Sequence, residues 1–138
     1  MAKTAHKIQI IGRLGRNPEM RYTPSGQPVT TMSVATTRQY TNAQEEKKEE
    51  TCWFRVTVWG KMAELCNQYL QKGSLVEIWG RMNPDANGNP RIWDKQDGTK
   101  GASFEVTANE VNFLDSRGAN GNGEGAAEEE QPVGEINW

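Results

Sequence analysis

Hydrophobic and polar residues alternate along five segments of the chain, and a period of two residues is typical of β-strands with one buried face. The five predicted strands cover residues 7–14, 29–37, 51–59, 75–81 and 104–114. In the second strand Met32 and Val34 are expected to point inward, and in the fourth Val76 and Ile78 are. The alternation therefore predicts a sheet with one apolar side.

One segment follows a helical period instead. Between residues 61 and 70 the apolar side chains recur at intervals of three and four, which predicts a single apolar stripe on an α-helix. These side chains belong to Met62, Leu65, Cys66, Tyr69 and Leu70. Gly73 stands just beyond the stripe, where a glycine commonly ends a helix.

The segments between these elements have the composition of turns and loops. Residues 15–28 are rich in proline and glycine and predict a turn-rich connection. Residues 41–50 are polar throughout and predict a solvated loop. Residues 83–101 place Asn-Gly and Asp-Gly dipeptides around the Arg-Ile-Trp segment 91–93, which predicts a protruding hairpin.

The order of the elements predicts an all-β fold, a five-stranded OB-fold barrel with one helix between the third and fourth strands. An open α+β sheet has the same periodicity and stays an alternative. Residues 1–115 are expected to form this domain. Residues 116–138 combine a flexible glycine-rich linker with an acidic tip, and their composition predicts a disordered C-terminal tail.

The net charge of −2 conceals an uneven distribution. All sixteen basic residues lie at or before Arg117, together with thirteen of the eighteen acidic residues. The other five acidic residues are glutamates between positions 118 and 138, so a basic body precedes an acidic tail. This division suggests a polyanionic ligand for the body and a basic protein partner for the tail.

Several classes of function are not expected. The chain has no apolar stretch long enough to span a membrane and no signal peptide at its N-terminus, so the cytoplasm is the expected compartment. Cys52 and Cys66 are expected to be reduced thiols there. With His6 as the single histidine, no metal site, no cofactor and no catalytic group is expected.

The third predicted strand carries the most informative side chains. Alternation puts Cys52, Phe54, Val56 and Val58 on a core face, and the opposite face then presents Trp53, Arg55, Thr57 and Trp59. Exposed tryptophans gain nothing from water, whereas a ligand with flat π-faces and negative charge would contact both indoles and the guanidinium. Single-stranded nucleic acid has these properties, and about 20 Å of strand between the indoles leaves room for several bases.

Other aromatic and basic residues extend this hypothesis. Trp93 beside Arg91 in the polar hairpin fits a clamp over a nucleic-acid strand, and Tyr40 near Arg38 fits a further stacking position. Trp79 shares an outward face with Arg81, and it fits a nucleic-acid contact and an oligomer contact equally well. The candidate phosphate contacts are Lys7, Arg13, Arg21, Arg38, Arg55, Lys61, Lys72, Arg81 and Arg91.

Five segments resemble landmarks of the bacterial single-stranded DNA-binding proteins, in order and at familiar spacing. They are Ile-Gly-Arg-Leu-Gly-Arg-Asn-Pro-Glu-Met-Arg-Tyr at 11–22, Ala-Thr-Thr at 35–37, Trp-Phe-Arg-Val at 53–56, Trp-Gly-Lys-Met-Ala-Glu at 59–64 and Tyr-Leu-Gln-Lys-Gly-Ser at 69–74. The resemblance covers residues 6–114. It implies an OB-fold that forms a homotetramer and binds single-stranded DNA without strong sequence preference, in DNA replication, recombination and repair.

The resemblance also assigns residues. Its stacking positions fall on Tyr40, Trp53, Trp59 and Trp93, and its basic contacts fall on Lys7, Arg21, Arg55, Lys61, Lys72 and Arg91. The acidic tip that docks onto replication, recombination and repair proteins in this family falls on Glu128, Glu129, Glu130, Ile136 and Trp138.

Two departures from the family pattern concern contacts with other chains. Phe54 stands where family members often have a histidine, which changes the expected subunit contacts. The chain ends in Ile-Asn-Trp where the family usually has Ile-Pro-Phe, and Pro132 and Gly134 separate the acidic residues from the terminal aromatic. The docking partners of the tip therefore stay open.

Three other functions are compatible with parts of the sequence. An OB-fold module for RNA, or a primosome adaptor, would use the same tryptophan and arginine face. A carbohydrate-binding module also stacks its ligand on exposed tryptophan, although interleaved arginines are not needed there. A protein-interaction scaffold would use the acidic tail but has no need of the Trp53–Arg55–Trp59 face.

Overall fold

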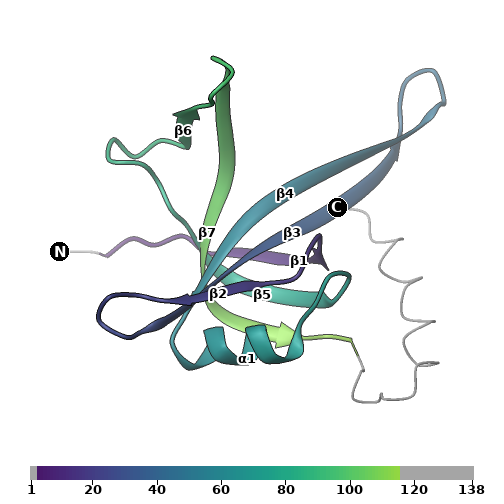
Figure 1. Cartoon of the computed structure of the whole chain (residues 1–138). Coiled ribbons are helices and arrows are strands. Elements are labelled where there is room, and N and C mark those ends of the chain that lie inside the picture. Colours follow the sequence, from purple (N-terminus) through teal and green to yellow (C-terminus); the bar gives the residue numbers. More distant parts are fainter. Residues whose placement is uncertain (1–2, 116–138) are drawn as a thin grey trace.

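The computed structural model describes residues 3–115, which form seven strands and one helix. The elements are β1 (Ile8–Leu14), β2 (Glu19–Tyr22), β3 (Pro28–Thr41), β4 (Lys47–Trp59), α1 (Lys61–Tyr69), β5 (Leu75–Met82), β6 (Arg91–Asp94) and β7 (Lys100–Phe113). The sheet order is β1-β5-β7-β4-β3-β2, and an additional pairing of β1 with β3 closes five strands into a barrel. The predicted OB-fold with one helix between its third and fourth barrel strands is confirmed (Figure 1).

The barrel interior is filled by the side chains that alternation assigned to it. Met32, Val34, Val76 and Ile78 are all buried, as predicted. Ile10, Leu14, Val56, Val58, Val106 and Val111 join them in one cluster. Since successive side chains of a strand point to opposite faces, the same alternation leaves the outer side of β4 free for other contacts.

The helix α1 closes one end of the barrel through Ala63 and Cys66, which are fully buried. The buried Thr30 hydroxyl donates a hydrogen bond to the Ala63 carbonyl at 2.8 Å, which ties the helix to β3. Burial raises the pKa of the Cys66 thiol to about 12, so this thiol stays protonated at neutral pH.

The predicted helical stripe departs from the structure at Tyr69, whereas Cys66 and Leu70 are buried as expected. Tyr69 is 49% exposed, and its ring lies 6.3 Å from that of Phe113 on β7. The helix already ends at Tyr69, and Leu70 caps it in an extended conformation. Gly73 belongs to the following turn, where its φ of 92° requires a glycine.

Two connections contain more strand than the sequence predicted. The turn-rich segment 15–28 includes β2, which pairs with β3 from Glu19–Thr31 to Tyr22–Pro28. The expected polar loop at 41–50 is a turn at residues 42–46 only, because β3 and β4 stay paired out to Thr41 and Lys47. The outer hairpin was missed because polar residues occupy both of its faces, and β2 was missed because it has only four residues, none of them buried.

The outer part of β3 and β4 forms a two-stranded ribbon held by cross-strand polar pairs. Arg38 donates to Glu50 at 2.8 Å and Gln39 donates to Glu49 at 3.2 Å. The predicted hairpin at 83–101 is also present, with β6 paired to the first residues of β7. Figure 1 shows this β6–β7 hairpin and the β3–β4 ribbon diverging from the barrel on the side away from α1.

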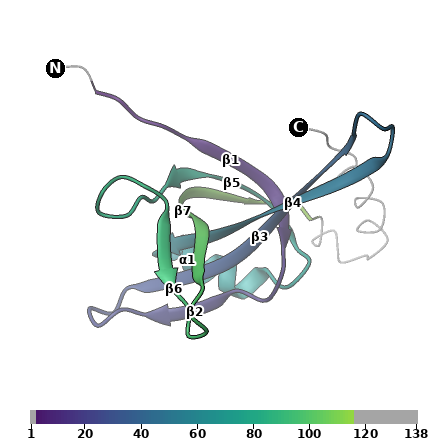
Figure 2. The ribbon, with the colours of Figure 1, turned by 90° about the horizontal axis from the view of Figure 1, so that it is seen from above.

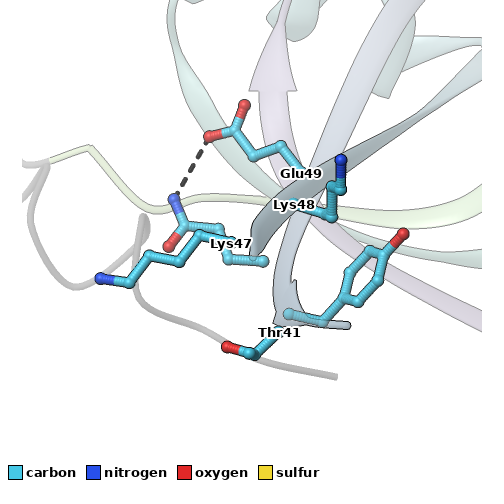
Figure 3. Close-up of a pocket in the computed structure, with 6 residues that line it drawn as sticks. Thr41, Lys47, Lys48 and Glu49 are labelled. Carbon is cyan, nitrogen blue, oxygen red and sulfur yellow. Dashed lines mark hydrogen bonds between the residues drawn. The ribbon is translucent and has the colours of Figure 1, made fainter. Parts of the chain in front are cut away.

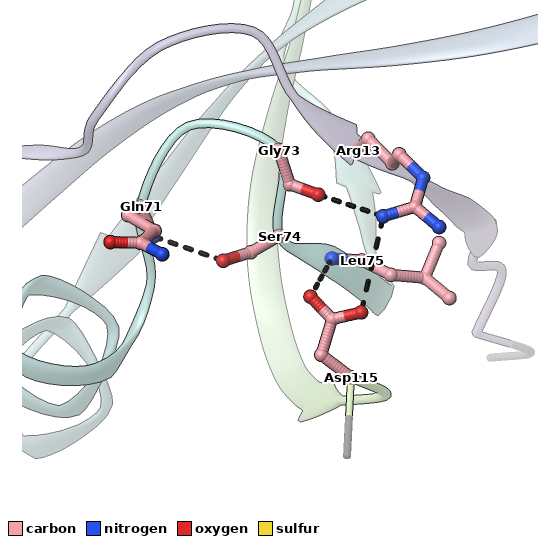
Figure 4. A network of polar contacts seen from close by, with 6 residues as sticks. All are labelled: Arg13, Gln71, Gly73, Ser74, Leu75 and Asp115. Atoms are coloured by element: carbon pink, nitrogen blue, oxygen red, sulfur yellow. Dashed lines mark hydrogen bonds and ion pairs between the residues drawn. The ribbon is translucent and has the colours of Figure 1, made fainter. Parts of the chain in front are cut away.

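A polar network joins the ends of three strands (Figure 4). The Asp115 carboxylate accepts a hydrogen bond from the Leu75 amide at 3.0 Å and lies 3.9 Å from the Arg13 guanidinium. Arg13 also donates to the Gly73 carbonyl at 2.8 Å. Arg13, a candidate phosphate contact by sequence, is therefore engaged within the protein at the point where β7 ends.

No helix among residues 3–115 has the length and apolar character needed to cross a membrane.

Candidate nucleic-acid interface

The outward face of β4 presents two half-exposed indoles with a guanidinium between them. Trp53 is 52% exposed and Trp59 is 45% exposed, whereas Val56 and Val58 on the opposite face are buried. Arg55 is exposed between the two indoles. The core face of β4 is therefore confirmed for Val56 and Val58, with Phe54 packed against the core, whereas Cys52 is only partly buried and lies outside the core cluster.

Neighbouring strands extend this face on one side. Trp59 lies opposite Val29 on β3, and Val29 lies opposite Arg21 on β2. Residues directly opposite each other in paired strands share a face, so Arg21 stands on the same side of the sheet as Trp59. The strand β2, which the sequence did not predict, is the element that brings Arg21 there.

The other side of β4 leads to the hairpin. Arg55 lies opposite Glu105 in the parallel pairing of β4 with β7. Further out on β7, Gly101 pairs with Trp93 and Ser103 pairs with Arg91. Gly101, Ser103 and Glu105 alternate along one strand, so Trp93 and Arg91 share their side of the sheet. We call the combined surface of Arg21, Trp53, Arg55, Trp59, Arg91 and Trp93 the aromatic–basic face.

Two glycines allow two of the indoles to pack directly against the backbone. A Cβ atom added at Gly15 would lie 2.5 Å from Cζ3 of Trp53, and one added at Gly101 would lie 2.6 Å from Cε2 of Trp93. Both indoles therefore lie closer to the backbone than any other residue type would allow. In the sequence these glycines resembled ordinary turn residues, and only the fold reveals their position beneath the rings.

Tyr40 does not share the aromatic–basic face. The uninterrupted pairing of β3 with β4 puts Ala35 opposite Trp53, and Tyr40 lies an odd number of residues from Ala35. Alternation therefore turns Tyr40 to the other side of the ribbon, where the Arg38 guanidinium lies 4.8 Å from its ring centroid. A nucleic-acid strand that contacts both Tyr40 and Trp53 must therefore wrap around the ribbon.

The end of the ribbon has an open hollow of about 480 Å³ beside Tyr40 (Figure 3). Two lysines, Lys47 and Lys48, line it together with Glu49 and the polar side chains of residues 39 and 41. Glu49 accepts a hydrogen bond from Gln39, and Lys48 forms an ion pair with Glu46 at 3.3 Å.

The three lysines predicted as DNA contacts lie at different edges. Lys61 begins α1, two residues after Trp59. Lys72 lies in the turn before β5, where its amide donates a hydrogen bond at 2.8 Å to the Asn17 side chain. Asn17 is two residues from Gly15, which packs against Trp53. Lys7 precedes β1 and lines a different hollow with Trp79 and Gly80. Lys61 and Lys72 thus flank the aromatic–basic face, whereas Lys7 lies apart from it.

A carboxylate lies beside Arg55 on this face. The Glu105 side chain is only 11% exposed, and its Oε2 lies 3.8 Å from Nη1 of Arg55. The same oxygen accepts a hydrogen bond from the Ser103 hydroxyl at 2.7 Å. No pattern in the sequence predicts this pair, because fifty residues separate its members.

Figure 2, a view turned by 90° from that of Figure 1, shows the β6–β7 hairpin in front of β3 and β4.

The predicted partner-binding tip, with Glu128, Glu129, Glu130, Ile136 and Trp138, lies outside the described residues. Among residues 3–115 no three histidine, cysteine, aspartate or glutamate side chains are grouped so that they could hold a metal ion.

The closed barrel and the aromatic–basic face define an OB-fold protein with an open binding surface in place of an enclosed site. A family model described as the single-strand binding protein family matches residues 5–114. The chain belongs to this family.

Curated relatives agree with the family match. The chain is 38% identical over 118 residues to the single-stranded DNA-binding protein of Neisseria meningitidis serogroup A, covering 86% of this chain and 64% of the relative. It is 35% identical over 122 residues to single-stranded DNA-binding protein 1 of Chlorobaculum tepidum, covering 88% and 72%. The chain therefore spans slightly less than two thirds of the Neisseria relative.

Solved structures support the fold. The SSB of Plasmodium falciparum in complex with ssDNA superposes with a TM-score of 0.66 at 28% identity, covering 83% of this chain and 99% of that one. A deletion mutant of the single-stranded DNA binding protein from Thermus aquaticus gives a TM-score of 0.65 at 30% identity, covering 86% and 54%.

Proposed function

We propose that this protein binds single-stranded DNA without strong sequence preference. The observation that carries the proposal is the pair of half-exposed indoles, Trp53 and Trp59, on either side of Arg55 on one face of the sheet. Every base has a π-face, so stacking on an indole tolerates any sequence. Membership of the single-strand binding protein family supports the same ligand.

The geometry gives each group a role. Six residues of extended strand separate the two indoles by about 20 Å, which leaves room for several bases between them. Arg55 would contact the phosphates that pass between the stacked bases, with Arg21 beside Trp59 and Arg91 beside Trp93. Lys61 and Lys72 would continue this path at the edges of the face, and Tyr40 would stack a base after the DNA has wrapped the ribbon.

The wider biological role is part of the same proposal. The protein would protect exposed single strands in the cytoplasm, at the nucleoid, during DNA replication, recombination and repair. It would act as a homotetramer and recruit proteins of these processes through its acidic C-terminal tip. The five glutamates after position 118 support a basic partner surface for the tip. Light scattering after size-exclusion chromatography would measure the number of subunits.

The first test is a titration with poly(dT) while tryptophan fluorescence is recorded. Strong quenching that saturates at a fixed ratio of nucleotide to protein is expected, because stacked bases quench indoles. Competition with poly(U) of equal length would then separate DNA from RNA as the preferred ligand. Tighter binding of poly(U) would favour an RNA module, and no binding of either polymer would overturn the proposal.

Binding is expected to weaken with rising salt. Each phosphate neutralised by a lysine or arginine contributes about −0.7 to the slope of log K against log salt concentration for single strands. Four contacts by Arg21, Lys61, Lys72 and Arg91 would thus give a slope of about −3. Titrations at several salt concentrations measure this slope, and a slope near zero would show that the basic residues do not contact phosphates.

The substitution Gly101→Ala is expected to weaken DNA binding, even though the new methyl group does not itself contact the DNA. The added Cβ would lie 2.6 Å from Cε2 of Trp93, so the indole must move away from the backbone at residue 101. The loss should approach that of Trp93→Ala, about 1–3 kcal/mol, whereas the free energy of unfolding should change by less than about 0.5 kcal/mol. Fluorescence anisotropy of a labelled dT oligonucleotide measures the affinity.

The control for this prediction is the combined variant Gly101→Ala with Trp93→Ala. If the glycine acts only through the indole, the combined variant binds as weakly as Trp93→Ala alone. A further loss in the combined variant would mean that Gly101 affects the DNA by another route.

A further inference from the structure

Glu105 is a carboxylate at the centre of a surface that presents Arg21, Arg55 and Arg91 to a polyanion. It lies opposite Arg55, at the centre of the aromatic–basic face. Its side chain is 11% exposed, whereas that of Arg55 is 53% exposed. The carboxylate is thus the buried partner of the pair, and the guanidinium is the solvent-exposed partner.

The contacts of the Glu105 side chain orient it toward Arg55. Oε2 accepts a hydrogen bond from Ser103 at 2.7 Å and lies 3.8 Å from Nη1 of Arg55. Ser103 and Glu105 share one side of β7, so the hydroxyl holds the carboxylate within the same face. No other ion pair of Arg55 exists in the part of the chain that the structure describes.

This pair contributes little to stability. Ion pairs with an exposed partner contribute about 0–1 kcal/mol to folding, because water already solvates the charges well. A negative charge in a DNA-binding face also repels phosphates, so the position of Glu105 is unfavourable for simple electrostatic attraction. The effect of the pair should therefore be found in ligand binding.

From this geometry we infer that Glu105 limits the affinity for single-stranded DNA by competing with phosphate for Arg55. The inference rests on the proposed function. In the free protein the carboxylate partly neutralises the guanidinium, and a phosphate that contacts Arg55 must displace or share it. The centre of the face then binds DNA mainly by stacking on Trp53 and Trp59, while the other arginines of the face, Arg21 and Arg91, lie toward its edges.

The test is the substitution Glu105→Gln, which keeps the size of the side chain and an oxygen that accepts from Ser103. Binding of a labelled dT oligonucleotide is expected to become about two- to fivefold tighter at low salt, the range given by partly exposed ion pairs. The salt slope is expected to steepen by about 0.7, because one more phosphate is neutralised. Thermal unfolding checks that the variant is folded.

Two further variants separate this mechanism from a change in net charge. Glu19 lies opposite Thr31 on β3, which lies opposite Thr57 on β4, so it stands on the same face as Arg55. No ion pair of Glu19 exists among residues 3–115, so Glu19→Gln removes the same charge without freeing an arginine. It should leave the salt slope unchanged. In an Arg55→Ala background, Glu105→Gln should no longer steepen the slope.

The outcomes are distinct. Unchanged or weaker binding by Glu105→Gln, or an equal steepening in the Arg55→Ala background, would overturn the role of Glu105 while the wild-type protein still binds DNA. Failure of the wild-type protein to bind the oligonucleotide would overturn the proposed function, and the inference with it.

Discussion

Replacing Trp53 and Trp59 together with alanine is expected to weaken binding of single-stranded DNA by about 2–6 kcal/mol, since each stacked base contributes about 1–3 kcal/mol. The two indoles lie about 20 Å apart on one extended strand, so their effects should add. Anisotropy of a labelled dT oligonucleotide at fixed salt measures the loss. The fold should persist, because both side chains are about half exposed in the free protein.

The matched control for this variant is Tyr22→Ala. Tyr22 is an exposed aromatic residue on β2, 59% accessible, and alternation turns it to the side opposite Arg21. Its replacement should leave the affinity unchanged. An equal loss for Tyr22→Ala, or full affinity in the double tryptophan variant, would show that DNA does not lie on the aromatic–basic face.

The variant Ile78→Ala is expected to lower the free energy of unfolding by about 2–5 kcal/mol. Ile78 is fully buried at the centre of β5, between Ile10 on β1 and Val111 on β7. The truncation leaves a cavity that the closed barrel cannot fill by collapsing. Urea unfolding followed by circular dichroism measures the change, which is a large part of the 5–15 kcal/mol typical of a domain.

The variant Ile92→Ala makes the same chemical change at an exposed position. Ile92 lies on β6 and is 62% exposed, so its truncation should change the free energy of unfolding by less than about 0.5 kcal/mol. Similar losses in both isoleucine variants would contradict the assignment of Ile78 to the core of the barrel.

Hydrophobic alternation predicted the barrel because each barrel strand has one face in the core. Met32, Val34, Val76 and Ile78 were assigned inward from their spacing alone, and all four are buried. The strand β2 and the outer ribbon of β3 and β4 were missed for the corresponding reason. They pair through backbone hydrogen bonds and polar side chains, and neither face of the ribbon is packed into the core.

The aromatic–basic face could be predicted only in part. Alternation along β4 was enough to place Trp53, Arg55 and Trp59 together, because all three lie on one strand. It could not place Arg21, Arg91 or Trp93 beside them, since strand pairing and register are properties of the sheet. Tyr40 was predicted as a stacking position from its place near Arg38 and from the family resemblance, and only the register shows that it lies on the other side of the ribbon.

The sequence by itself determined which residues fill the core and which strand carries the stacking indoles, because both follow from local alternation between neighbouring positions. Only the tertiary structure decided which residues meet across strands. Gly15 lies under Trp53, Gly101 lies under Trp93, and Glu105 lies against Arg55. Except for the pair in the β6–β7 hairpin, these residues are far apart in the chain, and the register of the closed barrel brings them into contact.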